Sequence, residues 1–357
     1  MHIPVGIRSL AISLPSIIRT NDYYREKYPD IVAKAEDKNL AKFMSLANST
    51  PSNEYELAME PYLKDPFRGT VKRPILGPGE SALTLEYRAA KDALAAGNFT
   101  INDIDLLIVS SFLPDQPGFG NAAFLARELG MQCPAWNLDA SCASGPMALQ
   151  TATALIQSGT YRNILVVISC TYSRLVDEND TLSWFFGDAA GAYVVGSLSH
   201  GQGLLASKAI NTSFTCNQFS VKDTVNEEGK HRLRFVVARD TNKIIAENAP
   251  NMIKTCCEGA VAAAGLKLDD IDFFISTTPT AWFVDLCTHL LHIDPKRTIN
   301  LYPECANIGG ALTLFNLYHA AKMGKIREND LVLLYGFGAA SSSVAIVMRW
   351  GDVKVAD

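Results

Sequence analysis

The chain has few charged residues and no excess of positive charge. Only 19% of its 357 residues are charged, and 32 Lys and Arg stand against 37 Asp and Glu, which gives a net charge of −5. Nucleic-acid binding needs a concentrated positive face, so this balance argues against a nucleic-acid partner. The sequence also lacks an apolar run long enough to span a bilayer, and residues 1–13 lack the features of a signal peptide. We therefore expect a cytoplasmic protein that does not associate with membranes.

The sequence also lacks the cysteine spacings of zinc sites and disulfide frameworks. Its eight cysteines are scattered within apolar segments and form no Cys-x-x-Cys pair. This pattern is typical of reduced thiols, so we expect neither structural disulfides nor a metal site. The eight positions are Cys133, Cys142, Cys170, Cys216, Cys256, Cys257, Cys287 and Cys305.

Length and hydrophobic content are sufficient for a large core. Hydrophobic residues make up 48% of the chain, which is longer than a typical single domain. Residues 268–278 resemble residues 101–111, and residues 331–336 resemble residues 164–169, both at an offset of 167 residues. Each pair contains an apolar run typical of a strand that is buried on both faces. We therefore predict an α/β protein made of two similar βαβ-rich halves.

The two predicted halves are residues 1–200 and 201–357. Residues 21–63 are the most polar part of the first half, and we expect them to form surface helices and loops outside the core sheet. A helical insertion is expected at about residues 23–76. Residues 66–74 are a basic loop. A solvated run of charge is favoured for this loop over an entrance that meets a phosphate group.

Cys142 lies in the most informative stretch of the chain, residues 137–150. A short extended run leads through a small-residue turn into an apolar helix, so Cys142 stands where a buried strand ends and a buried helix begins. Unpaired N–H groups and the positive end of the peptide dipoles at a helix start favour the thiolate form. The amide of Cys142 is then placed to donate to a developing oxyanion. The alternative is a buried structural cysteine, which is the commoner fate of a single Cys.

Several motifs in order resemble the thiolase fold and, within it, the β-ketoacyl-ACP synthase III group. They are the duplicated halves, the Cys142 turn, Phe186-Gly-Asp-Ala-Ala-Gly-Ala and Tyr335-Gly-Phe-Gly-Ala-Ala-Ser. The resemblance extends from about residue 5 to residue 350. It implies a five-layered αβαβα architecture and a homodimeric enzyme that uses a CoA or acyl-carrier-protein thioester as substrate, without a cofactor.

The resemblance implies roles for three positions. Cys142 takes the acyl group, and the backbone amides of Cys142 and Ala339 hold the oxyanion. The family usually has Gly at the place of Ala339. Asn307 matches the asparagine that assists decarboxylation of a malonyl partner by stabilising the enolate oxygen. An unrelated interpretation of Asn307 is a helix N-cap, and the two roles are compatible.

A histidine that the family uses beside this asparagine is missing. The family's Pro-His-Gln reads Ser276-Thr277-Thr278 here, so Thr277 stands at the place of the histidine. None of the six histidines replaces it in the sequence, and His231 and His292 are the nominal candidates for a relocated one. The thiol loses its usual proton acceptor, and the enolate loses one of two donors, which costs on the order of 3 kcal/mol in comparable oxyanion sites.

Acyl loading is less demanding than decarboxylation, because the thiol and the leaving group are chemically alike. We therefore expect Cys142 to accept an acyl group, and malonyl decarboxylation to be weak or absent. The acceptor would be an activated carbon, an amine or a hydroxyl in fatty-acid-like or polyketide specialised biosynthesis. Two alternatives stay open. One is decarboxylative Claisen condensation assisted by Thr277, Asn307 and an ordered water, and the other is a catalytically silent partner subunit.

Further positions are implied by the resemblance with less support. Arg174 matches an arginine that contacts the nucleotide at the tunnel mouth, and Phe119 lies in the segment that closes the acyl pocket of the neighbouring subunit. Ordinary surface or interface packing is an equally good explanation of both. Aromatic residues near the motifs are candidate walls of the acyl pocket. These are Trp184, Phe185, Phe186 and Trp282.

Overall fold

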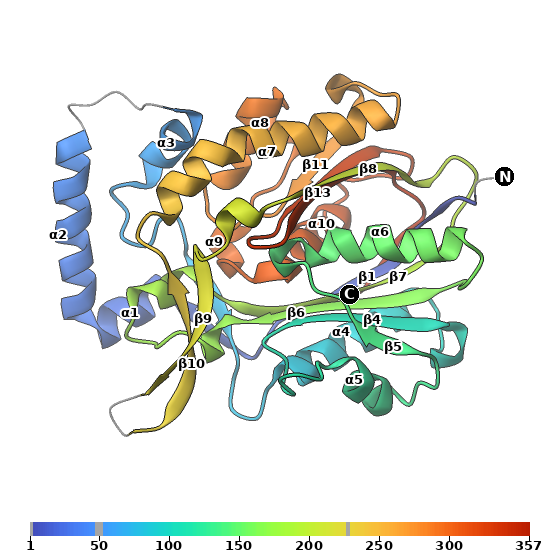
Figure 1. Cartoon of the computed structure of the whole chain (residues 1–357), viewed down its shortest axis with the longest axis horizontal. Coiled ribbons are helices and arrows are strands. Elements are labelled where there is room, and N and C mark those ends of the chain that lie inside the picture. The colour runs from blue at the N-terminus through green and yellow to red at the C-terminus, as the bar shows by residue number, and fades with distance from the viewer. Residues whose placement is uncertain (1–2, 47–52, 226–228) are drawn as a thin grey trace.

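Two β-sheets that share an arrangement of four strands form the centre of the molecule (Figure 1). In each sheet two parallel strands are followed by two antiparallel neighbours, so β4, β6, β7 and β1 of one sheet correspond to β11, β12, β13 and β8 of the other. The first sheet has the order β14 (Lys354–Val355), β1 (Val5–Ser13), β7 (Asp188–Ser197), β6 (Ile164–Thr171), β4 (Leu106–Phe112) and β5 (Ala135–Asn137). The second has the order β11 (Phe273–Ser276), β12 (Leu331–Phe337), β13 (Ser342–Arg349) and β8 (Gly203–Asn211). The predicted duplication of an α/β unit is confirmed.

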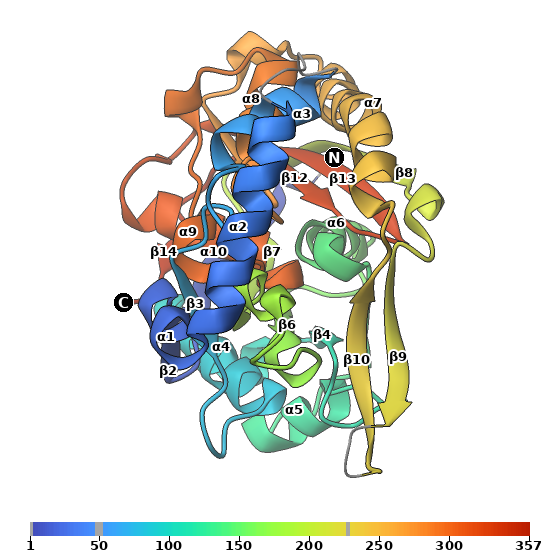
Figure 2. The ribbon, with the colours of Figure 1, turned by 90° about the vertical axis from the view of Figure 1, so that its left-hand side faces the viewer.

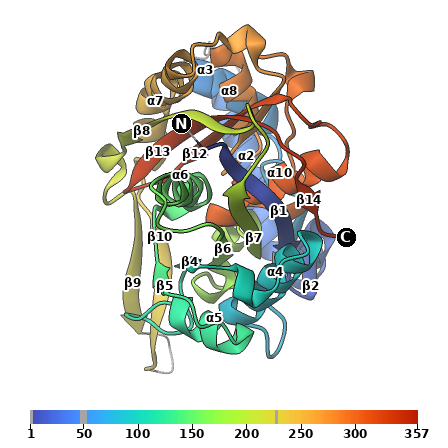
Figure 3. The same cartoon turned by 90° about the vertical axis from the view of Figure 1, so that its right-hand side faces the viewer.

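This computed structural model describes residues 3–46, 53–225 and 229–357, without the side chains of residues 41–46. Helices and sheets alternate in it in five layers (Figures 1 and 3). Helices α4 (Ala82–Ala96) and α5 (Ala122–Leu129) cover the outer face of the first sheet, and α7 (Thr241–Ala263) and α8 (Phe283–Leu291) cover that of the second. Helices α6 (Ser144–Gln157) and α10 (Leu312–Lys322) lie between the sheets. The αβαβα architecture implied by the family resemblance is therefore confirmed.

The apolar patterns of the sequence explain this layering. Every residue of β6 and β12 is buried, because helices cover both faces of their sheets. The middle layer is buried against both sheets, and one continuous core joins side chains of α6 and α10 to strands of each sheet. The division of the chain at residue 200 stays a prediction. It is supported by the end of β7 at Ser197 and the start of β8 at Gly203.

The polar segment after β1 lies on one side of the layers, outside the two sheets (Figure 2). It contains α1 (Asn21–Lys27), α2 (Pro29–Leu46) and α3 (Glu54–Met59). The strands β2 (Ile17–Thr20) and β3 (Lys72–Ile75) pair with each other in a small sheet of their own. Helix α3 packs against α7 and α8, so this segment is attached to the second half of the chain as well as to the first.

The basic loop of residues 66–74 is not a solvated run of charge, and the sequence-based expectation was wrong at Arg73. This side chain is fully buried, and its guanidinium donates to the carbonyl of Trp184 at 3.0 Å and to Asn21 Oδ1 at 2.6 Å. It also lies over the rings of Tyr24 and Phe67. Burial lowers the pKa of Arg73 to about 10. A buried cation needs such partners, which local charge density in a sequence does not reveal.

A β-hairpin and a short helix complete the elements that surround the site. Strands β9 (Phe219–Val225) and β10 (His231–Val237) pair antiparallel and extend from the layer of α7 toward that of α5 (Figures 1 and 2). Helix α9 (Tyr302–Cys305) precedes the loop that carries Asn307. Among the described residues, no helix combines the length and the apolar character that crossing a membrane requires.

Candidate active site

A tight turn places Cys142 at the start of α6. Ser141, the residue before it, has a left-handed φ of +56°, and its N–H donates to Asp139 Oδ1 at 2.7 Å. The hydroxyl of Ser144 accepts the N–H of Ala140 at 3.0 Å and donates to the carbonyl of Ser141 at 2.7 Å. These bonds hold the turn on both sides of Cys142, which lies between β5 and α6 as the sequence predicts. The expectation that the preceding strand is buried was wrong, because β5 is a three-residue edge strand with no buried residue.

Cys142 lines a cavity of about 710 Å³. This volume is in the usual range for small-molecule sites, which are mostly apolar with a few polar groups. Helix α3 and the loop after it contribute Tyr55, Met59 and Arg68, so the polar N-terminal segment closes one side of the cavity. The apolar wall is formed by Met59, Phe112, Leu182, Phe185, Phe186, Phe219, Val221, Phe235, Val237, Ile245, Trp282, Phe283 and Phe337.

The surroundings of Cys142 favour the neutral thiol over the thiolate. Burial raises its pKa, and the nearby carboxylate of Asp139 acts in the same direction, while hydrogen bonds from Tyr172 and Ser141 act against them. The expectation that the helix start makes this cysteine lose its proton more readily is therefore corrected. Loss of water around the sulfur outweighs the local donors, because a thiolate needs solvation or a strong partner.

Asn307 lines the same cavity and is held by three hydrogen bonds. Its N–H donates to the carbonyl of Phe185 at 2.9 Å, and its carbonyl accepts the N–H of Gly187 at 3.0 Å. Its side-chain oxygen accepts the N–H of Gly309, two residues further on, at 2.8 Å, while the N-cap of the short helical turn Gly309–Ala311 is Ile308. Because the amide oxygen is occupied, the NH₂ group is the part of this side chain that remains for a ligand. The helix N-cap interpretation of Asn307 was wrong, because Ile308 and Ala311 are the N-caps of the two helices that follow, and its donor role stays a prediction.

The loop of Ala339 packs directly against the Cys142 turn. A Cβ at Gly338 would lie 2.3 Å from the carbonyl oxygen of Ala140, so this approach requires glycine. Ala339 lines the cavity together with Cys142. In the part of the chain that the structure describes, the N–H groups of Cys142 and Ala339 donate to no other backbone group. Neither N–H group is committed to another backbone partner, so their role as an oxyanion hole stays a prediction.

Comparison with known proteins identifies the family. The model of 3-oxoacyl-[acyl-carrier-protein] synthase III matches residues 136–213, and the C-terminal model of the same family matches residues 261–350. The β-ketoacyl-ACP synthase III of Agrobacterium fabrum is 30% identical over 286 residues, which cover 79% of this chain and 88% of that protein. The chain belongs to the 3-oxoacyl-ACP synthase III family. It is therefore an acyl-transferring enzyme.

Other relatives and solved structures of synthase III enzymes support the same family assignment. The β-ketoacyl-ACP synthase III of Gloeobacter violaceus is 30% identical over 295 residues, covering 79% of this chain and 88% of that protein. Among solved structures, synthase III of Thermus thermophilus has a TM-score of 0.79 at 24% identity and covers 97% of this chain and 99% of its own. The priming β-ketosynthase of the R1128 polyketide pathway has a TM-score of 0.79 at 20% identity, with 98% of each chain covered. At these identities the solved structures establish the shared thiolase-type fold.

The residue at the place of the family's histidine does not reach the cavity. Thr277 is fully buried, and its hydroxyl donates to the carbonyl of Tyr335 at 3.2 Å and accepts the N–H of Phe337 at 2.9 Å. These two hydrogen bonds join the end of β11 to β12. The residues of this segment that line the cavity are Pro279 and Thr280, which follow Thr278. The proposed catalytic role of Thr277 is corrected on this ground, because its hydroxyl is committed to backbone partners.

No histidine lines the cavity in the described part of this synthase III chain. His231 is exposed on the β9–β10 hairpin and pairs with Asp223 at 2.9 Å. His292 ends α8 in a left-handed conformation. Neither nominal candidate for a relocated catalytic histidine is at the site, and His2 lies outside the described residues.

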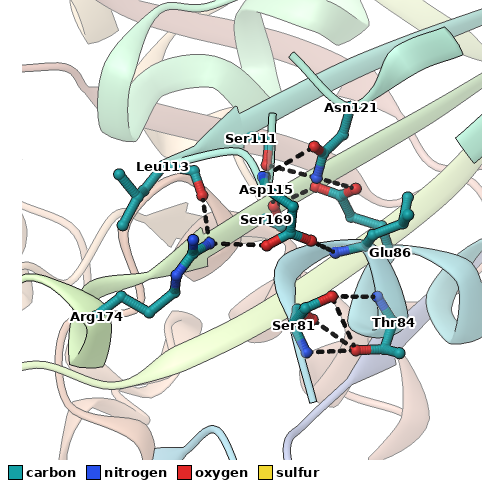
Figure 4. Close-up of polar contacts among 10 residues, drawn as sticks. Ser81, Thr84, Glu86, Ser111, Leu113, Asp115, Asn121, Ser169 and Arg174 are labelled. Atoms are coloured by element: carbon teal, nitrogen blue, oxygen red, sulfur yellow. Dashed lines mark hydrogen bonds and ion pairs between the residues drawn. The ribbon is translucent and has the colours of Figure 1, made fainter. Parts of the chain in front are cut away.

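Arg174 belongs to a polar network around Asp115 (Figure 4), and it is not among the residues that line the cavity. Its guanidinium pairs with Asp115 at 2.8 Å and donates to the carbonyl of Leu113 at 3.1 Å. Asp115 in turn accepts the N–H of Leu83, and its own N–H donates to Asn121. A nucleotide contact by Arg174 stays a prediction, and such a contact would compete with the ion pair.

The same network contains a carboxylate that is completely buried. Glu86 on α4 accepts hydrogen bonds from Asn121 at 2.8 Å and from Ser169 at 2.5 Å (Figure 4). Burial raises the pKa of Glu86, although both donors act against this. Ser169 lies on β6 and Asn121 precedes α5, so this group joins three elements on the outer face of the first sheet.

The two remaining predicted substrate contacts have different surroundings. Phe119 is 80% exposed, and its carbonyl accepts a hydrogen bond from Asn137 at the end of β5. The part of Phe119 in a neighbouring subunit's pocket stays a prediction.

Trp184 is not a wall of the cavity, and that expectation was wrong. It is buried against Phe67 and Tyr24, whereas Phe185, Phe186 and Trp282 do line the cavity.

Sequence reasoning missed Tyr172 and Asp188. Tyr172 follows β6 directly, lines the cavity, and has its hydroxyl 3.8 Å from Cys142 Sγ. Asp188 accepts the N–H groups of Leu76 at 2.8 Å and Ser173 at 2.9 Å, and so holds the turn that begins at Tyr172. The rule that sites collect at the carboxyl ends of parallel strands was the signal that points to Tyr172.

The β9–β10 hairpin is attached over the cavity by two arginines. Arg232 pairs with Asp177, and Arg234 pairs with Asp177 at 3.0 Å and Asp180 at 3.2 Å. Half-exposed pairs of this kind contribute about 1 kcal/mol or less each. We expect Arg232→Ala combined with Arg234→Ala to raise the acyl-donor concentration that half-saturates acylation by about two- to tenfold, since 1.4 kcal/mol is tenfold.

Salt provides the control for this prediction. At about 0.5 M NaCl the difference between the native protein and the double variant is expected to shrink, because exposed charges are screened. Lys222→Ala, which removes a charge from the same hairpin at a residue with no ion pair among those described, is expected to behave like the native protein. An equal effect of Lys222→Ala would contradict a specific role for the two arginines.

Proposed function

We propose that the protein takes an acyl group from a CoA or acyl-carrier-protein thioester onto Cys142. It then passes this group to a carbon, amine or hydroxyl acceptor in fatty-acid-like or polyketide specialised biosynthesis. The observation that carries the proposal is the composition of the site. Cys142, Asn307 and Ala339 line one aromatic-walled cavity in which, among the described residues, there is no histidine. Acyl carrier protein or CoA is the partner that follows from the family membership, and no cofactor is required.

The acyl-loading step needs only groups that the cavity contains. Cys142 Sγ attacks the thioester carbonyl, and the negative oxygen is held by the N–H groups of Cys142 and Ala339. The intermediate then expels the donor's sulfur, and the proton of the Cys142 thiol passes to it. The products are the Cys142 thioester and the free donor thiol. The two thiols are chemically alike, so exchange does not depend on a strong base.

Decarboxylation of a malonyl partner requires groups that acyl loading does not. It develops charge on an enolate oxygen, and Asn307 is the family donor that remains for it here. Removal of one such donor costs about 10²–10³ in rate in comparable sites. The proposed acceptor is therefore a nucleophile that does not depend on decarboxylation at this site.

We infer that the protein is a cytoplasmic homodimer, as the family resemblance implies. The short strand β5 is the edge of the first sheet, and an unpaired edge is a site for pairing with another chain. The exposed ring of Phe119 lies beside this edge, because Asn137 of β5 donates to its carbonyl. Sedimentation of the purified protein tests this inference, and a monomer at micromolar concentration would contradict it.

Intact-mass measurement tests the main proposal. The protein is incubated with acyl-CoA donors of increasing chain length, and a gain of one acyl mass is expected within minutes. In parallel, release of labelled carbon dioxide from malonyl-thioester is expected to be at least about 100-fold slower than acylation. Absence of any adduct would favour a catalytically silent partner subunit. Carbon dioxide release as fast as acylation would favour decarboxylative condensation.

A further inference from the structure

A tyrosine hydroxyl lies within hydrogen-bonding reach of the Cys142 sulfur. The hydroxyl of Tyr172 lies 3.8 Å from Sγ, within reach of a hydrogen bond to sulfur. Its ring is 4% exposed, so the phenol faces the thiol across a site from which water is largely excluded. Contacts of this kind are often long in ligand-free enzymes and shorten when the substrate is bound.

Tyr172 is held firmly from several sides. Its ring packs against Phe186 at a centroid distance of 4.3 Å, Phe112 at 5.1 Å and Phe235 at 5.3 Å. On the backbone, the carboxylate of Asp188 holds the neighbouring N–H of Ser173. A side chain with so little freedom keeps its hydroxyl in place without a further loss of entropy when the reaction occurs.

The loop of Asn307 meets the same tyrosine. Gly309 has a φ of +58°, and a Cβ there would lie 3.4 Å from the Tyr172 ring and 2.5 Å from the sulfur of Cys170. Glycine at this position therefore lets the Asn307 turn approach Tyr172. Tyr172, Asn307 and Cys142 all line one cavity, so the phenol shares the site with both predicted catalytic residues.

We propose that Tyr172 is a catalytic residue of this enzyme and that its hydroxyl donates to the Cys142 sulfur in place of the missing imidazole. This inference deepens the proposed function and rests on it for the acylation step. Sγ–H plus the acyl thioester gives the Cys142 thioester plus the donor thiol, and the thiol proton ends on the departing sulfur. Tyr172 keeps its own proton throughout and stabilises the sulfur while it carries negative charge.

A donor role is the one that the surroundings of Tyr172 support. Burial raises the pKa of its phenol well above the usual value, and the neighbouring thiols act in the same direction. A group that stays protonated donates a hydrogen bond but accepts no proton as a general base. This distinguishes Tyr172 from the family's histidine.

The test is the pH profile of Cys142 alkylation by iodoacetamide, read by intact mass and peptide mapping. Alkylation needs the thiolate, so the rate rises with pH until the raised pKa of Cys142 is passed. In Tyr172→Phe we expect the profile to move to higher pH by about one unit and the rate at pH 8 to fall about tenfold, since one pKa unit is a tenfold change in thiolate. Acylation by acyl-CoA is expected to slow similarly.

Two controls separate this role from packing. Tyr24→Phe removes the hydroxyl of another fully buried tyrosine, which lies outside the cavity, and its profile is expected to match the native protein. Replacement of Tyr172 by 3-fluorotyrosine makes the phenol a stronger donor at nearly constant size and is expected to move the profile to lower pH. If Tyr172→Phe does not fold, the 3-fluorotyrosine variant alone tests whether the Tyr172 hydroxyl donates to the Cys142 sulfur.

An unchanged profile in both Tyr172 variants would overturn the inference, even if their melting temperatures fall. Its failure is distinguishable from that of the proposed function. Native protein that forms no acyl adduct contradicts the proposed function, while the alkylation profiles still decide the role of Tyr172. Native protein that forms the adduct, with Tyr172→Phe acylated equally fast, contradicts the role of Tyr172 alone.

Discussion

Replacement of Cys142 by alanine is expected to abolish the acyl adduct and to lower acyl transfer at least about 10³-fold. Loss of a covalent nucleophile is among the largest single effects in enzymes, because the remaining oxyanion donors and binding surface act on a reaction that no longer has its attacking group. The side chain is half-buried and its neighbours in the turn keep their hydrogen bonds, so we expect the variant to fold.

Adduct mass and transfer rate, each measured with the acyl-CoA that loads fastest, check this prediction. Cys216→Ala is the matched control, because Cys216 is an exposed thiol outside the cavity. That variant is expected to keep the full adduct. Cys170 is buried, and burial raises its pKa well above the usual value, so it is a poor competitor. An adduct that persists in Cys142→Ala and disappears in Cys216→Ala would contradict the whole assignment of the site.

Thr277→His, which restores the family's residue in sequence, is expected to destabilise the protein without restoring decarboxylation. Thr277 is fully buried between β11 and β12. A larger ring there overpacks the core at a cost of about 1–3 kcal/mol. It also removes the acceptor of the Phe337 N–H, and an unsatisfied buried donor costs about 1–3 kcal/mol more. The sum, about 2–6 kcal/mol, is a large part of the 5–15 kcal/mol that typically stabilises a domain.

Denaturant unfolding and carbon dioxide release from malonyl-thioester measure the two parts of this prediction. Thr277→Val is the matched control, since it keeps the shape of threonine and removes only the hydroxyl. We expect it to lose about 1–3 kcal/mol, the hydrogen-bond share of the effect. A Thr277→His variant that is as stable as the native protein and releases carbon dioxide tenfold faster would show that the site is one substitution from the family's usual chemistry.

Several features of this protein could be read from sequence because they depend on neighbours along the chain. Apolar runs at a constant offset predicted the two similar α/β halves. A strand, a small-residue turn and a helix in succession predicted the position of Cys142. Each is a local pattern, since hydrophobic periodicity and turn composition depend on residues a few positions apart.

Tertiary structure alone decided how the cysteine is surrounded. The partner of Cys142 is Tyr172, which is 30 positions away in the sequence, and Thr277 is turned into the sheet by hydrogen bonds to residues about 60 positions away. Arg73 is buried although its segment is basic, because Asn21 and the Trp184 carbonyl meet it in space. Desolvation decides the protonation of Cys142, and it depends on everything packed around the sulfur. A local sequence pattern cannot predict this desolvation, because the groups that pack around the sulfur come from distant parts of the chain.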